Sequence, residues 1–202
     1  MSDPAALTHV FFDIGGVLGT NGWDREQRAR VAAHFSLDAD FDHRHHQVVG
    51  ALESGAMSLD EYLRFTVFLT PQEFSREDFI LAMQAESRPF PECIALAGRV
   101  RKDLRRMTLN NESEALNLHR IESFGLRAIF EAFLSSCWLR GVKPELDFFR
   151  RALAIAQAEP SQSLFVDDRE QNLVPARELG MRTILYRNPV QLEGELKANG
   201  VL

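Results

Sequence analysis

A short apolar run near the N-terminus ends in one carboxylate and two glycines, and this feature most constrains the fold. Residues 9–12 are followed by Asp13 and, one residue later, by Gly15 and Gly16. The pattern predicts a buried strand that ends in a sharp turn and leaves Asp13 at the edge of a sheet. An aspartate in this position can simply open the turn by accepting hydrogen bonds from backbone amides. The alternative interpretation makes Asp13 a nucleophile.

A second apolar run, far along the chain, favours the chemical interpretation. Residues 163–166 are followed by Asp167 and Asp168. Two parallel strands that both end in Asp bring their carboxylates to the same edge of the sheet, where ligands bind in open α/β folds. Carboxylates held close together repel one another unless a hard divalent cation lies between them. The sequence therefore predicts a magnesium site formed by Asp13, Asp167 and Asp168.

The order of the predicted elements indicates an α/β fold with a helical insertion. Residues 20–88 predict a series of helices, whereas helices and strands alternate from Pro89 onward. That alternation is typical of a parallel sheet with right-handed crossovers. We expect a Rossmann-like, doubly wound parallel sheet built from residues 1–18 and 89–202, and an all-helical cap formed by residues 19–88 over the strand ends.

Capping signals and turn residues set the expected boundaries. A capping box begins at Ser58, and the apolar residues Phe65, Phe68 and Leu69 predict that its helix packs on more than one face. Pro144 is expected to open a helix. The other predicted helices cover 25–35, 42–54, a stretch from Ser75, 91–102, 112–124, 172–179 and 189–199, and the predicted strands after the first cover 104–110, 130–135, 163–166 and 182–186.

Composition and charge exclude some classes of partner. The 202-residue chain has a net charge of −6, which argues against nucleic acid or an anionic membrane as the main partner. No apolar run approaches the ~20 residues of a membrane span, and residues 1–4 lack the features of a signal peptide. We therefore expect a cytoplasmic protein, a monomer or a homodimer, in which Cys93 and Cys137 remain reduced thiols.

Further polar residues follow the predicted strands at the same sheet edge. Asn110 and Asn111 come at the end of the second strand, and Lys143 precedes Pro144. A carboxylate nucleophile, a cation, amide donors and an acidic pair suit phosphoryl transfer, because the charge on the equatorial oxygens must be stabilised.

Together these segments resemble the four motifs of the haloacid dehalogenase superfamily. The segments are residues 12–18, 109–111, 141–144 and 165–181. Their order and spacing match along nearly the whole chain, and the resemblance is to the helical-cap phosphatases, which include sugar-phosphate phosphatases and the phosphatase domain of soluble epoxide hydrolase. It implies a magnesium-dependent phosphatase that acts on a small phosphorylated metabolite, such as a sugar phosphate, through an aspartyl-phosphate intermediate.

The resemblance also implies roles for individual residues. Asp13 would attack phosphorus, Lys143 would neutralise the nucleophile and the phosphate, and Asn110 and Asn111 would bind the phosphate. The implied metal ligands are Asp13, the backbone carbonyl of Gly15, Asp167 and Asp168.

The chain departs from the family pattern at two positions. Gly15 stands where the family usually has a second aspartate, which protonates the leaving group, and Asn110 replaces a Ser or Thr, although its amide can also donate. General acid catalysis is typically worth ~10²–10⁴ in rate, so its loss slows a phosphatase without abolishing it. The alternative function is a degenerate member that binds phosphate and metal as a sensor or partner-binding subunit. A true dehalogenase, which needs no metal, is disfavoured by the acidic pair.

The predicted cap contains candidates for substrate contact. His43 and His46 can share one face of a helix, but without an acidic or Cys partner they suit a solvated or substrate-facing cluster better than a metal site. We expect Arg44 or one of the histidines at 43, 45 and 46, together with Asn21 or Trp23, to contact the leaving group of the substrate.

Overall fold

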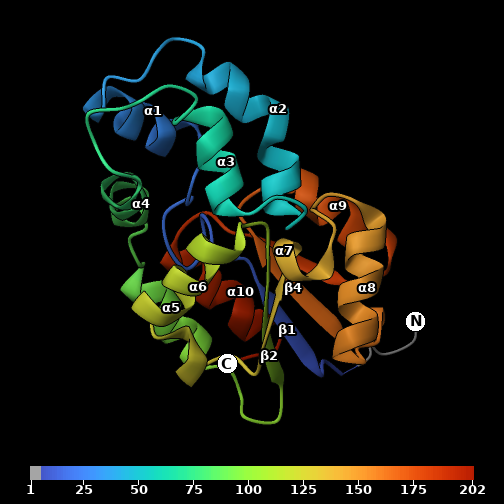
Figure 1. The fold of residues 1–202 in the computed structure, drawn as a ribbon. Helices are drawn as coiled ribbons and strands as arrows, with labels where there is room; N and C mark the ends of the chain where they lie inside the picture. The colour runs from blue at the N-terminus through green and yellow to red at the C-terminus, as the bar shows by residue number, and fades with distance from the viewer. Residues whose placement is uncertain (1–5) are drawn as a thin grey trace.

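A single parallel sheet of five strands forms the centre of the molecule (Figure 1). The structure, a computed structural model, describes residues 6–202, so the expectation about residues 1–4 lies outside the described residues. The strands lie in the order β3-β2-β1-β4-β5, and each neighbouring pair is parallel. Their bounds are β1 His9–Phe12, β2 Arg105–Asn110, β3 Ala132–Ser135, β4 Ser163–Asp167 and β5 Arg182–Leu185. The predicted doubly wound α/β fold is therefore confirmed.

The register of the central strands fixes where the acidic residues meet. Phe12 at the end of β1 lies opposite Val166 of β4, so Asp13 and Asp167 leave adjacent strands at the same edge. The backbone N–H of Asp13 donates to the Val166 carbonyl at 2.9 Å, which extends the ladder by one residue. Both strands are fully buried, as expected for the middle of a parallel sheet.

Helices cover both faces of the sheet and separate its core into two clusters. Alternate strand residues such as Val10 and Phe12 pack against α5 and α10, whereas Phe11 and Phe165 pack against α8 and α9. Figure 1 shows these helix pairs on opposite sides of the strands. The helices of the sheet-bearing part are α5 Pro91–Gly98, α6 Glu114–Ser123, α7 Ser136–Leu139, α8 Leu146–Ala156, α9 Glu170–Glu178 and α10 Pro189–Ala198, with short 3₁₀ turns at η1 Leu126–Ala128 and η2 Pro160–Gln162.

Four helices between β1 and α5 form a layer over the carboxyl edge of the sheet, which we call the cap (Figure 1). They are α1 Arg25–His34, α2 Phe41–Glu53, α3 Leu59–Thr66 and α4 Arg76–Ala85. The cap has its own apolar cluster, built around Tyr62, Leu63 and Phe79, and Leu116 of α6 joins it from below. The capping boxes at Ser58 and Ser75 start α3 and α4. The division into domains at residues 18 and 89 stays a prediction.

The two connections between the cap and the sheet are bonded to each other. Gly19 and Pro89 form an antiparallel bridge. Beside it, the backbone N–H of Thr20 donates to the Arg88 carbonyl at 2.9 Å, and the Thr20 hydroxyl donates to the Glu86 carbonyl at 2.6 Å. The chain therefore enters and leaves the cap through one short two-stranded segment.

Some predicted boundaries were wrong for local reasons. The helix from Pro91 ends at Gly98 and not at 102, because Arg99 closes it and the chain turns toward β2. Pro144 does not open α8: it follows a cis peptide bond, and the helix begins at Leu146. Leu69 is 59% exposed because α3 ends at Thr66, so Leu69 does not add to the packed faces of this helix as predicted. Among the described residues, we find no helix with the length and apolarity needed to span a bilayer.

Candidate active site

A buried lysine lies between two aspartates at the carboxyl edge of the sheet. The ammonium of Lys143, in the loop between α7 and α8, lies 2.9 Å from Asp13 Oδ2 and 2.6 Å from Asp167 Oδ2. The Lys143 side chain is only 2% exposed. The other oxygen of Asp13 accepts a 2.8 Å hydrogen bond from the backbone N–H of Ile14, which fixes the plane of the carboxylate. The structure thus brings three of the predicted site residues into direct contact.

The two carboxylates at the end of β4, Asp167 and Asp168, differ in their hydrogen bonding. Both oxygens of Asp167 accept hydrogen bonds, from Lys143, the Asn172 amide and the Arg169 backbone N–H. In contrast, Asp168 Oδ1 is buried and has no hydrogen-bond partner within residues 6–202. Ligand oxygens of Asp13, Asp167 and Asp168 lie within 4.8 Å of one another. An unpartnered buried oxygen in a group of three carboxylates fits a hard divalent cation.

Burial makes the carboxyl groups of Asp13 and Asp168 costly to ionise. Desolvation, followed by the charges of Asp167 and Asp168, raises the pKa of Asp13 above its usual range, although Lys143 opposes the shift. Burial and then the charge of Asp167 also raise the pKa of Asp168. The pKa of Lys143 is raised too, because Asp13 and Asp167 together outweigh its burial. A second cation beside Lys143 would therefore stabilise the ionised form of the group.

Two glycines shape the turn after Asp13. Gly16 has a φ of +77°, and a Cβ at this position would overlap the carboxylate of Asp168, so both the backbone conformation and the space require glycine. Gly15 lines the cavity beside Asp13. The turn lets Asp168 approach the backbone directly behind the predicted nucleophile.

The two asparagines after β2 have different surroundings. Asn110 is buried, donates to Asn117 Oδ1 at 2.9 Å and accepts from the Ser135 hydroxyl at 2.8 Å, and it does not line the cavity. The side chain of Asn111 lines the cavity, donates to the Lys143 carbonyl at 3.0 Å and accepts from its N–H at 2.8 Å. Of the two asparagines predicted to bind phosphate, Asn111 therefore lines the cavity next to Lys143, and the side chain of Asn110 does not.

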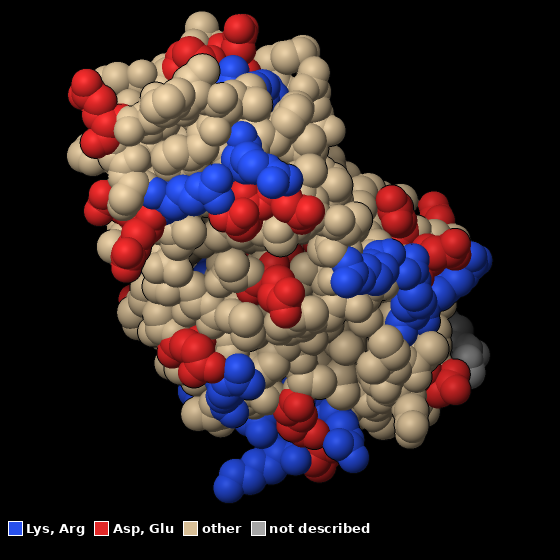
Figure 2. All heavy atoms as spheres, viewed as in Figure 1, with Lys and Arg blue, Asp and Glu red and all other residues tan. Residues whose placement is uncertain are grey.

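A cavity of about 510 Å³ lies between these residues and the cap. Its volume is typical of a site for a small molecule. Asn21 and Trp23 line it, as do His45 and His46. Arg44 does not, because its guanidinium pairs with Asp38 at 2.8 Å and donates to the Thr66 carbonyl. On the face drawn in Figure 2, basic and acidic side chains alternate around the middle of the molecule and form no continuous field of one sign.

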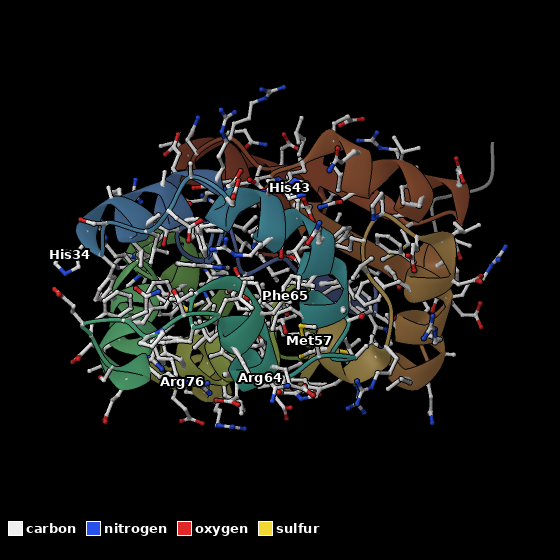
Figure 3. All side chains as sticks on the ribbon, turned by 45° about the horizontal axis from the view of Figure 1, so that its top comes forward. His34, His43, Met57, Arg64, Phe65 and Arg76 are labelled. Atoms are coloured by element: carbon white, nitrogen blue, oxygen red, sulfur yellow. The ribbon has the colours of Figure 1, made fainter. Side chains whose placement is uncertain are left out.

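Three histidines of the cap lie on α2, namely His43, His45 and His46, and the rings of His45 and His46 meet edge to face at 5.2 Å. Figure 3, which looks onto the cap, shows His43 on α2 and His34 at the far end of α1. His45 points inward, where its Nδ1 lies 2.8 Å from the Tyr62 hydroxyl, and that hydroxyl accepts from the Trp23 indole N–H at 2.8 Å. The indole can only donate, so the Tyr62 hydroxyl accepts from it and keeps its own proton available for Nδ1 of a neutral His45. Burial lowers the pKa of His45 to about 3, so it stays neutral.

Three charged residues that were not predicted from the sequence also line the cavity. Arg120 of α6 is 1% exposed and lies 3.6 Å from the carboxylate of Glu112, which is also buried. Glu53 at the end of α2 has no ion pair within the described chain, and burial, with the charge of Glu112, raises its pKa to about 7. The position of Glu112, directly after Asn111 at a strand end, was a usable signal, whereas nothing in the helical pattern singled out Arg120.

Comparison with known proteins identifies related sequences. A family model described as haloacid dehalogenase-like hydrolase matches residues 107–186, a range that includes Lys143, Asp167 and Asp168. Bifunctional epoxide hydrolase 2 of Rattus norvegicus is 31% identical over 132 residues, which are 63% of this chain and 24% of that protein. The Sus scrofa protein of the same name is 26% identical over 97% of this chain and 39% of its own. The chain thus spans less than half of these relatives.

Solved structures share the fold. A predicted haloacid dehalogenase-like hydrolase of Porphyromonas gingivalis has a TM-score of 0.78 at 23% identity and covers 96% of this chain and 98% of its own. A family enzyme of Bacteroides thetaiotaomicron, solved with magnesium and inorganic phosphate, has a TM-score of 0.78 at 20% identity over 90% and 95% of the two chains. L-2-haloacid dehalogenase of Xanthobacter autotrophicus has a TM-score of 0.62 at 17% identity over 97% and 84%.

Proposed function

The chain belongs to the haloacid dehalogenase-like hydrolases, and from that premise we propose that it is a magnesium-dependent phosphatase of small phosphorylated metabolites. The observation that carries the proposal is the position of Lys143, whose ammonium bridges Asp13 and Asp167 beside the unpartnered oxygen of Asp168. The ammonium of Lys143 and the three carboxylates, which suit a second cation, lie at a cavity of small-molecule size. Together they favour a dianionic phosphate as the ligand.

Asp13 is the nucleophile in this proposal. The Ile14 N–H holds its carboxylate in one orientation, and Lys143 stabilises both the carboxylate and the incoming phosphoryl oxygens. Attack on phosphorus breaks the bond to the ester oxygen, which departs with the leaving group, and gives an aspartyl-phosphate; a water molecule then hydrolyses it to inorganic phosphate and regenerates Asp13. Asp167 acts through Lys143 as a positioning residue, because its oxygens are already engaged by Lys143, Asn172 and Arg169.

Magnesium fits the residues that remain. Asp13 and Asp168 would hold the ion together with the backbone carbonyl of Gly15, and Asp167 lies close enough to contribute to the same charge. When bound, the ion neutralises the negative charge of the phosphoryl group and of the carboxylates around it. The magnesium and phosphate in the Bacteroides thetaiotaomicron enzyme support this assignment.

The acidic group also bears on the choice between phosphatase and dehalogenase. A 2-haloacid is itself a carboxylate, and displacement of halide by Asp13 would need neither a divalent ion nor the charged oxygen of Asp168. Three carboxylates near one another favour a reaction that uses a cation. A second candidate, a protein that binds phosphate and metal without turnover, is favoured by Gly15, which supplies no acid.

Turnover of p-nitrophenyl phosphate, with and without MgCl₂, tests the proposal. We expect EDTA to abolish the activity and Asp13→Asn to reduce it by about 10⁴-fold or more, while Asp103→Asn, an exposed carboxylate outside the cavity, leaves it intact. Chloride release from L-2-chloropropionate without turnover of any phosphate ester would favour the dehalogenase. Phosphate binding with equal inactivity of wild type and Asp13→Asn would favour the non-catalytic alternative. A panel of sugar phosphates and other small phosphate esters would then identify the substrate.

A further inference from the structure

Arg120 is a buried cation whose bonding capacity is largely unused. It lies on α6 and lines the cavity although only 1% of its side chain is exposed. Its Nη2 donates to the Thr20 carbonyl, but its Nε is buried and has no hydrogen-bond partner in the described structure. Its Nη1 makes no hydrogen bond within residues 6–202 and lies 3.6 Å from Glu112 Oε2. A guanidinium with free N–H groups next to a ligand cavity is suited to bind an anionic oxygen.

The guanidinium of Arg120 lies next to Gly15, two residues after Asp13. A Cβ at Gly15 would lie 3.5 Å from Arg120 Nη1 and 3.2 Å from Asn21 Oδ1. Because Gly15 has no side chain, the guanidinium faces the space directly next to the turn that carries the nucleophile. A side chain of any size at residue 15 would occupy that space.

The direction of the reaction places the leaving group in this space. In an in-line displacement the attacking and leaving oxygens lie on opposite sides of phosphorus. Asp13 attacks from the end of β1, at the floor of the cavity, so the leaving oxygen points away from the sheet and into the cavity. Beside Gly15, the walls of the cavity there are formed by Asn21, Gly22, Glu112 and Arg120.

We propose that Arg120 binds the leaving-group oxygen and stabilises its negative charge with an N–H hydrogen bond, in place of a proton donor. This inference rests on the proposed phosphatase function and narrows its substrate class. It selects phosphate compounds whose leaving oxygen is stable as an anion, such as anomeric sugar phosphates and acyl phosphates, over phosphate esters of simple alcohols.

The electrons and protons balance without a protein acid. The bond from Asp13 to phosphorus forms while the bond from phosphorus to the leaving oxygen breaks, and the electron pair stays on that oxygen. Arg120 shares the resulting charge through hydrogen bonding and keeps its own protons, as a guanidinium does. The released oxyanion then takes a proton from water.

Glu112 holds the guanidinium in this position. Its Oε1 accepts a 2.9 Å hydrogen bond from the Ser113 N–H, so the carboxylate is fixed at the end of β2. Its Oε2 attracts Arg120 from 3.6 Å without forming a hydrogen bond that would occupy Nη1. Glu112 is thus a positioning residue, and it compensates the buried charge of Arg120 when the cavity holds no substrate.

A series of aryl phosphates with leaving groups of graded pKa tests the inference. We expect Arg120→Lys and Arg120→Met to reduce turnover of the poorest leaving groups by about 10²–10³-fold, with a much smaller loss for p-nitrophenyl phosphate and a steeper dependence of log(kcat/KM) on leaving-group pKa. Arg30→Lys, an exposed arginine of the cap, is the matched control and leaves the slope unchanged. Thermal unfolding of each variant verifies that it is folded.

The wild-type enzyme provides a second test that needs no folded variant. If no proton is transferred as the leaving group departs, the pre-steady-state formation of the aspartyl-phosphate runs equally fast in H₂O and D₂O. Slower formation in D₂O would overturn the inference, as would equal losses for all leaving groups in the Arg120 variants. Failure of the phosphatase proposal has a different result, since wild type would then turn over no aryl phosphate and form no aspartyl-phosphate.

Discussion

Replacing Lys143 by methionine removes a buried ammonium that contacts two carboxylates. At an effective dielectric constant of about 20, the ion pairs at 2.9 and 2.6 Å are each worth about 6 kcal/mol before desolvation is counted. The desolvation of Lys143 offsets much of this, and removing one partner of a buried pair typically costs ~3–5 kcal/mol. Asp167 keeps its bonds from Asn172 and Arg169, and Asp13 keeps the bond from the Ile14 N–H, so we expect a loss near the lower end, about 3 kcal/mol.

Urea unfolding followed by tryptophan fluorescence, in EDTA, measures this loss. A change of about 3 kcal/mol corresponds to a decrease of about 6–12 °C in Tm for a chain of this size. Lys102→Met, which replaces an exposed lysine, is the control and should change stability by less than about 0.5 kcal/mol. A loss of less than about 1 kcal/mol in Lys143→Met would refute the view that this ammonium holds the two carboxylates together.

Three other predictions concern the metal site, the turn and the cap. Millimolar MgCl₂ should raise the Tm of wild type but not of Asp168→Asn, because an ion that binds only the folded state stabilises it; equal shifts would contradict the assignment of Asp168. Gly16→Ala should cost about 1–2 kcal/mol from its φ of +77° and abolish magnesium-dependent turnover by displacing Asp168, whereas Gly194→Ala, where a Cβ meets nothing, should retain activity. His45 has a pKa of about 3 in the folded state and near 6.5 in the unfolded state, so the unfolded state binds more protons between these pH values. The free energy of unfolding should therefore fall with decreasing pH, by up to about 1.4 kcal/mol per pH unit below pH 6.5. Urea titrations across that range should show that His45→Gln loses this component.

The sequence could predict the centre of the site because strand ends determine it. An apolar run followed by Asp reports both a buried strand and the edge at which it ends, so Asp13, Asp167 and Asp168 could be brought together before any coordinates were known. Lys143 was predictable from the resemblance to a family motif, and its contacts agree with that role.

The remaining residues depend on information that a linear pattern lacks. Neighbouring residues of a strand point to opposite sides, so only one of two adjacent asparagines can face the ligand, and the sequence does not indicate which. In the structure, Asn110 bonds to Asn117, whereas Asn111 lines the cavity. Arg44 does not line the cavity because its guanidinium forms an ion pair with Asp38 within the cap. The burial of Arg120 follows from its contacts with Thr20 and Gly22, which lie about a hundred positions earlier in the sequence.

The hydrogen bonds of Asn111 hold the backbone of Lys143 independently of residues 136–140, which precede it in the chain. Asn111, at the end of β2, holds both the N–H and the carbonyl of Lys143, so the lysine backbone is anchored to a neighbouring strand. Residues 136–140 contact the cap, where Ser136 donates to the Glu53 carbonyl and Arg140 to the Gly55 carbonyl, and the Ser136 hydroxyl also accepts from the backbone N–H of Glu112. A substitution of Arg140 can therefore alter how the cap lies over a ligand while the ammonium of Lys143 stays in place, so that selectivity changes independently of the residues around Asp13.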